Sequence, residues 1–578
     1  MDLFVIRKKM QFFLFKFDQN FLLLLIALIV GIFSGIAAVG LNSSIAFVSE
    51  FVESFHYTWY SFLFPGIGAA LSAIFLEKII REGSGHGVPE VIYSVGKYGG
   101  LLRFRSIFSR LVSSTLTIGS GGSAGPEAPV VISGAAIGSN IAKFFSLNER
   151  QRITLVGCGA AAAISAIFNA PVAGIIFTLE VILAEWNSVY LVPVAIASVA
   201  GTEISIFLKG NQIPFKSSGF SIGFEDVLAA AVLAILTAMV SVLFTRAMEK
   251  NHHVAEKTAS FFKLPFWLKA GIGGCIVGLI GYFLPDSMGE GYHSVREMIS
   301  GVYSNGMTMV AICMLAKILT TSITLGWGGS GGIFAPALVI GSFTGVLFFR
   351  ISSFLFPELH FVSEGCFALL GMSGVMAGVL QAPLTGVFLI VEITGSYEVI
   401  VPLIIVSTLS STLCRYLEPA SLYLKELVEK GQLLRPGTDS RVLSDLKISE
   451  LIEKDCINIS PDLLLKDVVS MLKVSKRNFF PVVDKDSMKF IGIVKFDNIR
   501  PYLLNPLLYE SVFVYQIMDK TIPTIQYREE LKDALDLMDK RHLFSIPVLD
   551  DKKFLGLLSK ATILDQYRRE LKVQTSEV

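Results

Sequence analysis

The chain has 578 residues, of which 52% are hydrophobic and only 17% are charged. Soluble proteins carry about 25% charged residues, so this composition excludes a soluble protein and predicts one that crosses a membrane several times. The net charge of +1 gives no reason to expect nucleic acid as a partner, and the six cysteines lack metal-ligand spacing.

The N-terminus carries a basic cluster before the first long apolar run. Four basic residues lie between Arg7 and Lys16, and the apolar run begins at Phe21. The run has no small-residue cleavage site at its end, which indicates a retained helix rather than a signal peptide. Because Lys and Arg favour the cytoplasmic side, we expect residues 1–20 to form a cytoplasmic N-terminus.

Charges are sparse from Phe21 to Leu427, where apolar segments follow one another in two series. The first series lies near 21–49, 59–80, 105–118, 130–145, 151–167, 172–184 and 188–208. The second lies near 224–248, 263–284, 307–325, 334–355, 365–380, 384–393 and 398–416. Several segments are shorter than the roughly 20 residues that span a bilayer. Short, interrupted segments in two halves are typical of inverted-repeat transporters, so we predict a membrane domain over 21–427 with repeats at about 21–208 and 224–427.

The two series contain an internal repeat. Gly119, Gly121, Gly122, Ser123, Gly125, Ala128 and Pro129 match Gly326, Gly328, Gly329, Ser330, Gly332, Ala335 and Pro336 in order. A second pairing sets 169–174 against 381–386, and a glutamate follows in both copies, at Glu180 and Glu392. A weaker echo pairs 85–87 with 289–291. We therefore expect two broken, Gly-rich turns to meet around one site.

The first of these turns, 119–129, holds the only charge between Leu111 and Ala142, at Glu127. Its glycines and prolines preclude a regular helix, and irregular backbone at membrane depth is tolerated only where it is buried or lines a water-filled cavity. A helix that starts here aims free N–H groups and its positive dipole end at that cavity. The stretch predicts an anion site that contains the Glu127 carboxylate.

Beyond Leu427 charged residues become frequent. Residues 447–499 and 513–564 each show the pattern of a β-α-β-β-α unit, with a Pro-Val strand start recurring at Pro481 and Pro547. We expect a linker over 428–446 and two compact α/β modules over 447–505 and 506–578.

The stretch Gly125-Pro126-Glu127-Ala128-Pro129, its partner 332–336 and the repeated tail together carry a resemblance to a known family. The membrane part resembles the CLC family of chloride channels and proton-coupled chloride antiporters, and the tail resembles a pair of CBS domains. The resemblance implies an all-α polytopic membrane fold with an inverted internal repeat, followed by an α/β CBS pair. It also implies that Glu127 gates the anion pathway, although Pro126 and Ala128 replace the basic residue and the glycine of the family motif.

Three further stretches match anion-binding motifs of the family. Gly332-Ile333-Phe334 matches its GxFxP motif, in which backbone N–H groups hold chloride, and Tyr423 matches its anion-coordinating tyrosine. The GSGIP motif aligns with 85–89, where His86 replaces the coordinating serine beside Gly87. Either the imidazole donates to the anion, or it points elsewhere and backbone N–H groups bind, so selectivity among anions stays open.

The resemblance leaves the transport mode open. Val181 stands where many proton-coupled members have an internal glutamate, and Glu180 next to it points about 100° away on a helix. This favours a chloride channel gated by Glu127, or a weakly coupled transporter, with regulation by the CBS domains as a further expectation; the alternative is a proton-coupled chloride (or other anion) antiporter. A second alternative is a CBS-regulated membrane sensor without transport.

The remaining expectations concern partners and location. We expect a homodimer in contact with membrane lipid, with chloride as the transported ion, no enzymatic activity, no metal and no cofactor. Adenine nucleotide binding by the CBS pair has weak support, because neither 492–498 nor 556–562 has the usual ribose-binding aspartate. The compact membrane domain suits a bacterial plasma membrane, with both termini in the cytoplasm.

Overall fold

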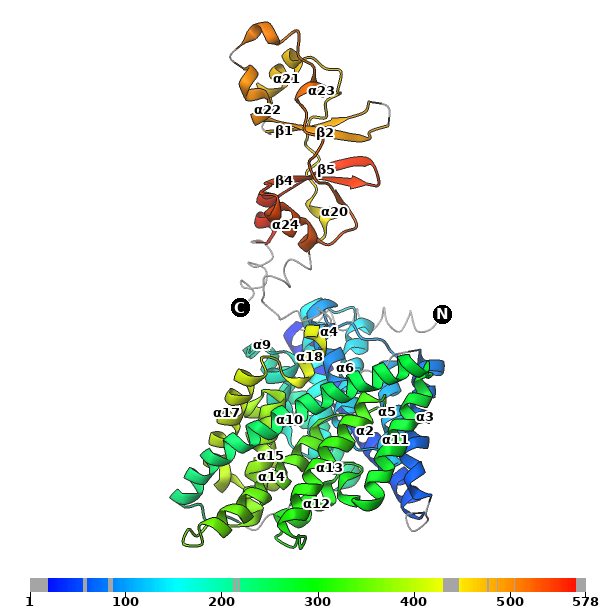
Figure 1. Ribbon diagram of the computed structural model, residues 1–578, viewed down its shortest axis with the longest axis vertical. Helices are drawn as coiled ribbons and strands as arrows, with labels where there is room; N and C mark the ends of the chain where they lie inside the picture. The colour runs from blue at the N-terminus through cyan, green and yellow to red at the C-terminus, as the bar shows by residue number, and fades with distance from the viewer. Residues whose placement is uncertain are drawn as a thin grey trace. The chain divides into compact units, whose positions relative to one another are not determined.

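The computed structural model describes residues 19–55, 60–81, 87–210, 215, 219–429, 446–475, 478–485, 487–503 and 505–567. The chain divides into two compact units, Met1–Leu433 and Leu434–Val578 (Figure 1). The predicted linker falls largely on 430–445, which lies outside the described residues.

The first unit is helical. Its first half contains α2 (Gln19–Glu53), α3 (Phe64–Ile74), α4 (Val88–Lys97), α5 (Ser106–Gly119), α6 (Glu127–Phe144), α7 (Glu149–Phe168), α8 (Pro171–Phe177) and α9 (Ser188–Lys209). Its second half contains α10 (Phe224–Phe262), α11 (Phe266–Phe283), α12 (Tyr292–Ile299), α13 (Met307–Gly326), α14 (Phe334–Leu355), α15 (Glu364–Leu380), α16 (Pro383–Thr394), α17 (Ile400–Leu417) and α18 (Leu422–Glu429).

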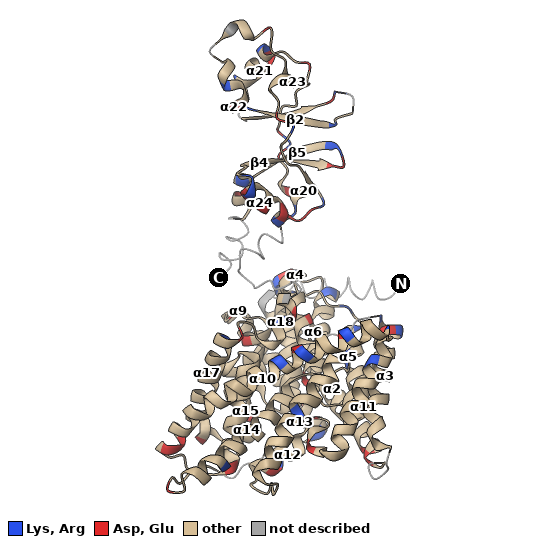
Figure 2. Ribbon diagram, in the orientation of Figure 1, with Lys and Arg blue, Asp and Glu red and all other residues tan. Residues whose placement is uncertain are grey.

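Among the described residues, nine helices are long and apolar enough to cross a membrane. Figure 2 shows few charged positions along the helices of this unit. The structure differs from the sequence-based prediction at α4 and α12, which no predicted apolar segment covers. Both helices are short and carry several polar residues, so hydropathy alone does not reveal them.

The internal repeat is visible in the backbone. Gly121 and Gly328 both have positive φ, at 104° and 109°, a conformation that favours glycine. Asn169 and Gln381 end α7 and α15 in the left-handed conformation, and a proline then begins α8 and α16. The same local chemistry therefore breaks the chain at the same places in each half.

Close helix packing is repeated as well. A Cβ atom added at Gly138 would lie 1.9 Å from the Leu155 carbonyl oxygen, and one at Gly345 would lie 1.9 Å from that of Phe367. Only glycine allows α6 to approach α7, and α14 to approach α15, this closely. These contacts and the apolar core shared by both halves confirm the predicted membrane fold.

The second unit consists of two α/β modules. The first has α21 (Leu465–Leu472), β1 (Phe479–Val483), β2 (Phe490–Lys495) and α22 (Phe496–Ile499), and α23 (Val514–Ile517) packs into its core. The second has β3 (Ile525–Gln526), α24 (Leu531–Lys540), β4 (Ser545–Asp550) and β5 (Lys553–Ser559), and α20 (Ile448–Leu451) packs into its core. Strands β1 and β2 pair antiparallel, while β4 pairs with β3 in parallel and with β5 antiparallel. The predicted α/β tail is confirmed.

Candidate functional site

The site lies where the two Gly-rich breaks meet. The N–H of Gly125 donates to the Gly332 carbonyl at 2.8 Å, and the N–H of Gly332 donates back to the Gly125 carbonyl at 2.7 Å. Each break is also held by the other half: the N–H of Ser123 donates to Thr324 Oγ1, and the N–H of Ser330 donates to Thr117 Oγ1, both at 3.2 Å. The predicted meeting of the two turns is therefore present, and it brings the starts of α6 and α14 together.

Glu127 is the first residue of α6 and is 1% exposed. Its Oε2 accepts a long hydrogen bond of 3.4 Å from the backbone N–H of Ala335, in the first turn of α14. Its Oε1 accepts a hydrogen bond of 2.7 Å from the Tyr292 hydroxyl. The carboxylate of the first half thus lies at the N-terminal end of a helix of the second half, where free N–H groups and the helix dipole favour negative charge.

Phe334 occupies the position of Glu127 in the second half and begins α14 directly after Gly332 and Ile333. Its ring packs against Phe168 at 5.5 Å and edge-on against Phe177 at 5.9 Å, between centroids. Both of these rings come from the first half, at the end of α7 and in α8. The three residues of the predicted anion motif are therefore part of the same junction as Glu127.

Tyr423 lies in α18, is 3% exposed and interacts electrostatically with Glu127. Its hydroxyl has no hydrogen-bond partner among the residues that the structure describes. Buried hydroxyl groups almost always have a partner, so one without a protein partner points to a ligand or an ordered water. The hydroxyl suits an anion, to which it can donate.

Gly87 precedes α4 with φ of 82°, and a Cβ atom there would lie 2.7 Å from the carbonyl oxygen of Ala128. The start of α4 therefore lies against the first turn of α6, next to Glu127. His86 lies outside the described residues, so its two interpretations both stay predictions.

The glutamates that mark the second repeated motif have reciprocal partners. Glu180 accepts hydrogen bonds from the N–H of Leu384 and Thr385 at the start of α16. Glu392 accepts from the N–H of Val172 and Ala173 at the start of α8, at 3.0 and 2.7 Å. Each carboxylate thus caps a helix of the opposite half. From the sequence, the two glutamates could be predicted only to recur in both halves, not to act as caps.

Val181 is half-buried and packs against the apolar core. It lies in a π-helical segment, Thr178–Ile182, that continues α8, whereas α16 remains α-helical to Thr394. The two halves are therefore unlike at this point, and π-helical turns are often found near functional sites.

Sequence reasoning missed Tyr292 as a contact of Glu127. The signal was the weak echo at 289–291, which directly precedes it. Tyr292 lines a cavity of about 730 Å³ together with Pro126, Lys209, Glu290 and Arg296. Pro126 precedes Glu127 and Tyr292 contacts it, so the cavity borders the junction, and its lining carries charges of both signs.

In the second unit, one carboxylate contacts 556–562, one of the two segments considered for nucleotide binding. Glu453 accepts hydrogen bonds from the hydroxyl groups of Ser559, at 2.6 Å, and Thr562. Adenine nucleotide binding stays a prediction, and these two hydroxyl groups already have a protein partner.

Comparison with known proteins gives consistent matches along the chain. The family model described as voltage gated chloride channel matches residues 68–415, and the CBS domain model matches 448–505 and 514–569. The H(+)/Cl(-) exchange transporter ClcA of Vibrio cholerae is 29% identical over 409 residues, which cover 68% of this chain and 86% of that protein. ClcA of Klebsiella pneumoniae is 27% identical over 413 residues, covering 69% and 87%.

Two solved structures show the same fold. A slow cyanobacterial Cl-/H+ antiporter matches with a TM-score of 0.64 and 23% identity, over 72% of this chain and 99% of that chain. A eukaryotic CLC transporter matches with a TM-score of 0.61 and 16% identity, over 94% and 99%. The second match extends into the C-terminal modules as well as the helical unit.

Proposed function

The chain belongs to the voltage gated chloride channel family, the CLC proteins, and from this premise we propose that it exchanges chloride for protons across a membrane, with Glu127 as the gate. Transmembrane chloride transport, as expected from the sequence, follows from the family. The proposal of proton-coupled exchange differs from the channel that the sequence analysis favoured. The similar proteins in Vibrio and Klebsiella are named as exchange transporters, which supports exchange here.

The observation that carries the proposal is the position of the Glu127 carboxylate on the first turn of α14. An ionised carboxylate and a chloride ion compete for the same N–H groups at a helix start. When Glu127 takes a proton, it loses its negative charge and leaves these donors to chloride. Proton uptake and anion entry are thereby linked through one side chain.

The anion would be held by groups that have no other acceptor in the described chain. The N–H groups of Ile333 and Phe334 lie at the start of α14, and the Tyr423 hydroxyl has no protein partner. Gly87 brings the start of a third helix to the same place. Three helix starts and one hydroxyl suit a single monovalent anion better than a larger substrate.

Channel conduction is the second candidate, and Val181 is the observation that favours it. An apolar side chain offers a proton from Glu127 no acceptor at this position. Exchange therefore requires another inward route for the proton, such as water, whereas conduction requires none.

Flux in reconstituted liposomes tests the proposal. We expect the wild-type protein to move protons against their gradient when chloride flows down its own. Glu127→Gln keeps the shape of the gate but cannot ionise, so proton transport is lost while chloride flux remains. Glu149→Gln, in the exposed first turn of α7, is the matched control and leaves both fluxes unchanged.

Other outcomes identify the competing functions. Chloride flux without coupled proton movement in the wild-type protein identifies a channel. Absence of any anion flux identifies a sensor without transport. Unchanged proton coupling in Glu127→Gln rejects Glu127 as the gate.

We further propose a homodimer in a bacterial plasma membrane, with both termini in the cytoplasm. The basic cluster before Phe21 supports the cytoplasmic N-terminus. The reciprocal caps join the starts of α8 and α16, and the exposed apolar side chains of Val172 and Leu384 lie there. A surface built from both repeats suits an interface that pairs with an identical copy.

A further inference from the structure

The hydroxyl of Tyr292 contacts the gate, and its surroundings fix its position. It donates to Glu127 Oε1 at 2.7 Å, and its ring packs edge-on against Phe215 at 5.4 Å between centroids. Tyr292 is the first residue of α12 and follows Gly291, whose φ of 83° turns the chain into the helix. The hydroxyl is thus aimed at the carboxylate from the second half of the protein.

A buried lysine holds the turn that precedes Tyr292. Lys317 is 0% exposed, and its Nζ donates to the carbonyl oxygens of Met288 at 3.1 Å and Gly289 at 2.8 Å. Thr320 Oγ1 donates to the carbonyl oxygen of Ser287 at 2.9 Å. These bonds from α13 fix the backbone that leads into α12.

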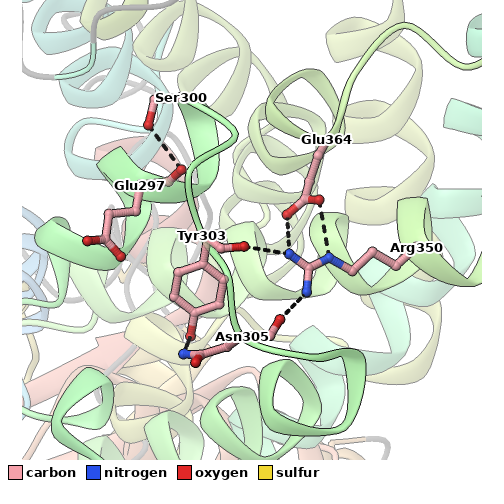
Figure 3. A network of polar contacts seen from close by, with 6 residues as sticks. All are labelled: Glu297, Ser300, Tyr303, Asn305, Arg350 and Glu364. Carbon is pink, nitrogen blue, oxygen red and sulfur yellow. Dashed lines mark hydrogen bonds and ion pairs between the residues drawn. The ribbon is translucent and has the colours of Figure 1, made fainter.

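The other end of α12 is held by an ion pair (Figure 3). Arg350 makes two hydrogen bonds to Glu364, at 2.7 and 3.1 Å, and donates to the carbonyl oxygens of Tyr303 and Asn305 just beyond the helix. Paired in this way, the guanidinium has little freedom to move. Because both ends of α12 are tied to neighbouring helices, the Tyr292 hydroxyl stays in place when Glu127 moves.

We propose that Tyr292 is a positioning residue for the gate, which holds the ionised Glu127 carboxylate on the start of α14 and lets it go when it takes a proton. The inference rests on the proposed gating role of Glu127. A tyrosine hydroxyl donates more strongly to an ionised carboxylate than to a neutral carboxyl group. Tyr292 therefore stabilises the closed, ionised state over the open, protonated one.

The two tyrosines at the junction would have different tasks. The Tyr292 hydroxyl is bonded to the gate, whereas the Tyr423 hydroxyl has no partner among the described residues. The first serves the carboxylate and the second serves the anion. The charged and titratable groups around Glu127 are these two tyrosines and Glu290, with Lys209 and Arg296 in the same cavity.

The test is the pH dependence of chloride flux in Tyr292→Phe. Removing the donor disfavours the ionised form of Glu127, so the protonated, open gate persists to higher pH. We expect the midpoint of the flux–pH curve to rise by about one pH unit, the size of a single hydrogen bond to a charged group. Tyr397→Phe is the matched control, because it makes the same substitution at an exposed tyrosine shortly after α16 and leaves the midpoint unchanged.

A double variant separates this inference from the proposed function. In a Glu127→Gln background, Tyr292→Phe produces no further shift, because the group on which it acts no longer titrates. An unchanged midpoint in Tyr292→Phe, with a clear effect of Glu127→Gln, overturns the role of Tyr292 alone. If Tyr292→Phe does not fold, Phe215→Leu tests the same role, because it loosens the packing of the tyrosine ring. We expect it to raise the midpoint of the flux–pH curve, and an unchanged midpoint overturns the role of Tyr292.

Discussion

At the scale of residues, the polar side chains at the junction differ in how many hydrogen-bond partners the protein gives them. Glu127 accepts hydrogen bonds from two donors of the second half, whereas the Tyr423 hydroxyl has no hydrogen-bond partner among the described residues. A buried donor without an acceptor loses the full free energy of its solvation. A bound anion would restore it, and under the proposed function Tyr423 would then link anion binding to the stability of the site.

This link predicts the effect of Tyr423→Phe on anion binding. Because a hydrogen bond to a charged partner contributes about 1.5–3 kcal/mol, we expect the Kd for chloride to rise at least about tenfold. Titration calorimetry of the purified protein measures this. The control is Tyr416→Phe, at the exposed end of α17, which binds chloride as the wild-type protein does. An unchanged Kd in Tyr423→Phe would exclude its hydroxyl from the anion site.

At the scale of elements, the sequence predicted the helix boundaries that depend on local residue chemistry. The break at 119–129 is confirmed between the end of α5 and the start of α6, and the predicted segment 334–355 coincides with α14. Glycine, proline and hydropathy decide these boundaries within a few residues of the chain. The helix α10 extends beyond the predicted 224–248 to Phe262, because its charged and polar C-terminal part still consists largely of helix-forming residues.

Contacts between distant segments were beyond prediction for a physical reason. Tyr292 contacts Glu127 although 165 residues separate them in the sequence, and neither hydrophobic periodicity nor motif spacing predicts a contact between such distant segments. The reciprocal caps could be predicted only in part. The sequence shows that Glu180 and Glu392 recur, but the N–H groups that they cap come from the opposite repeat and are identified only in the folded structure. The candidate gate was predicted from its motif, whereas its donors required the structure.

The caps allow a prediction on helix stability. Glu392→Ala leaves the N–H groups of Val172 and Ala173 without their acceptor, and loss of a helix cap costs about 1 kcal/mol. We expect a lower midpoint of thermal unfolding in detergent, and a larger drop for Glu180→Ala, which also loses the Thr385 hydroxyl bond of 2.7 Å.

The control for the caps is Glu398→Ala, an exposed glutamate shortly after α16 that caps neither α8 nor α16. Its unfolding midpoint should match that of the wild-type protein. Equal midpoints for all three variants would show that the caps contribute no stability.

At the scale of the whole molecule, the proposed dimer gives a measurable mass. We expect light scattering in detergent to give about twice the chain mass of 63.0 kDa. Ile404→Trp adds bulk to the exposed face of α17, next to α16, and should shift the protein toward single chains. Leu279→Trp, on an exposed face of α11, is the control and should leave the dimer intact. Single chains in the wild-type protein would reject the dimer.

The paired hydrogen bonds between Gly125 and Gly332 have a mechanical consequence. They fasten the two halves of the membrane unit to each other beside the gate, at the point where a rocking transporter would need its halves to separate. Swinging one half against the other would break both bonds and expose four backbone groups at membrane depth, where no water replaces the lost partners. These two bonds therefore oppose a separation of the halves at the junction, and the proposed gating requires only the Glu127 side chain to move.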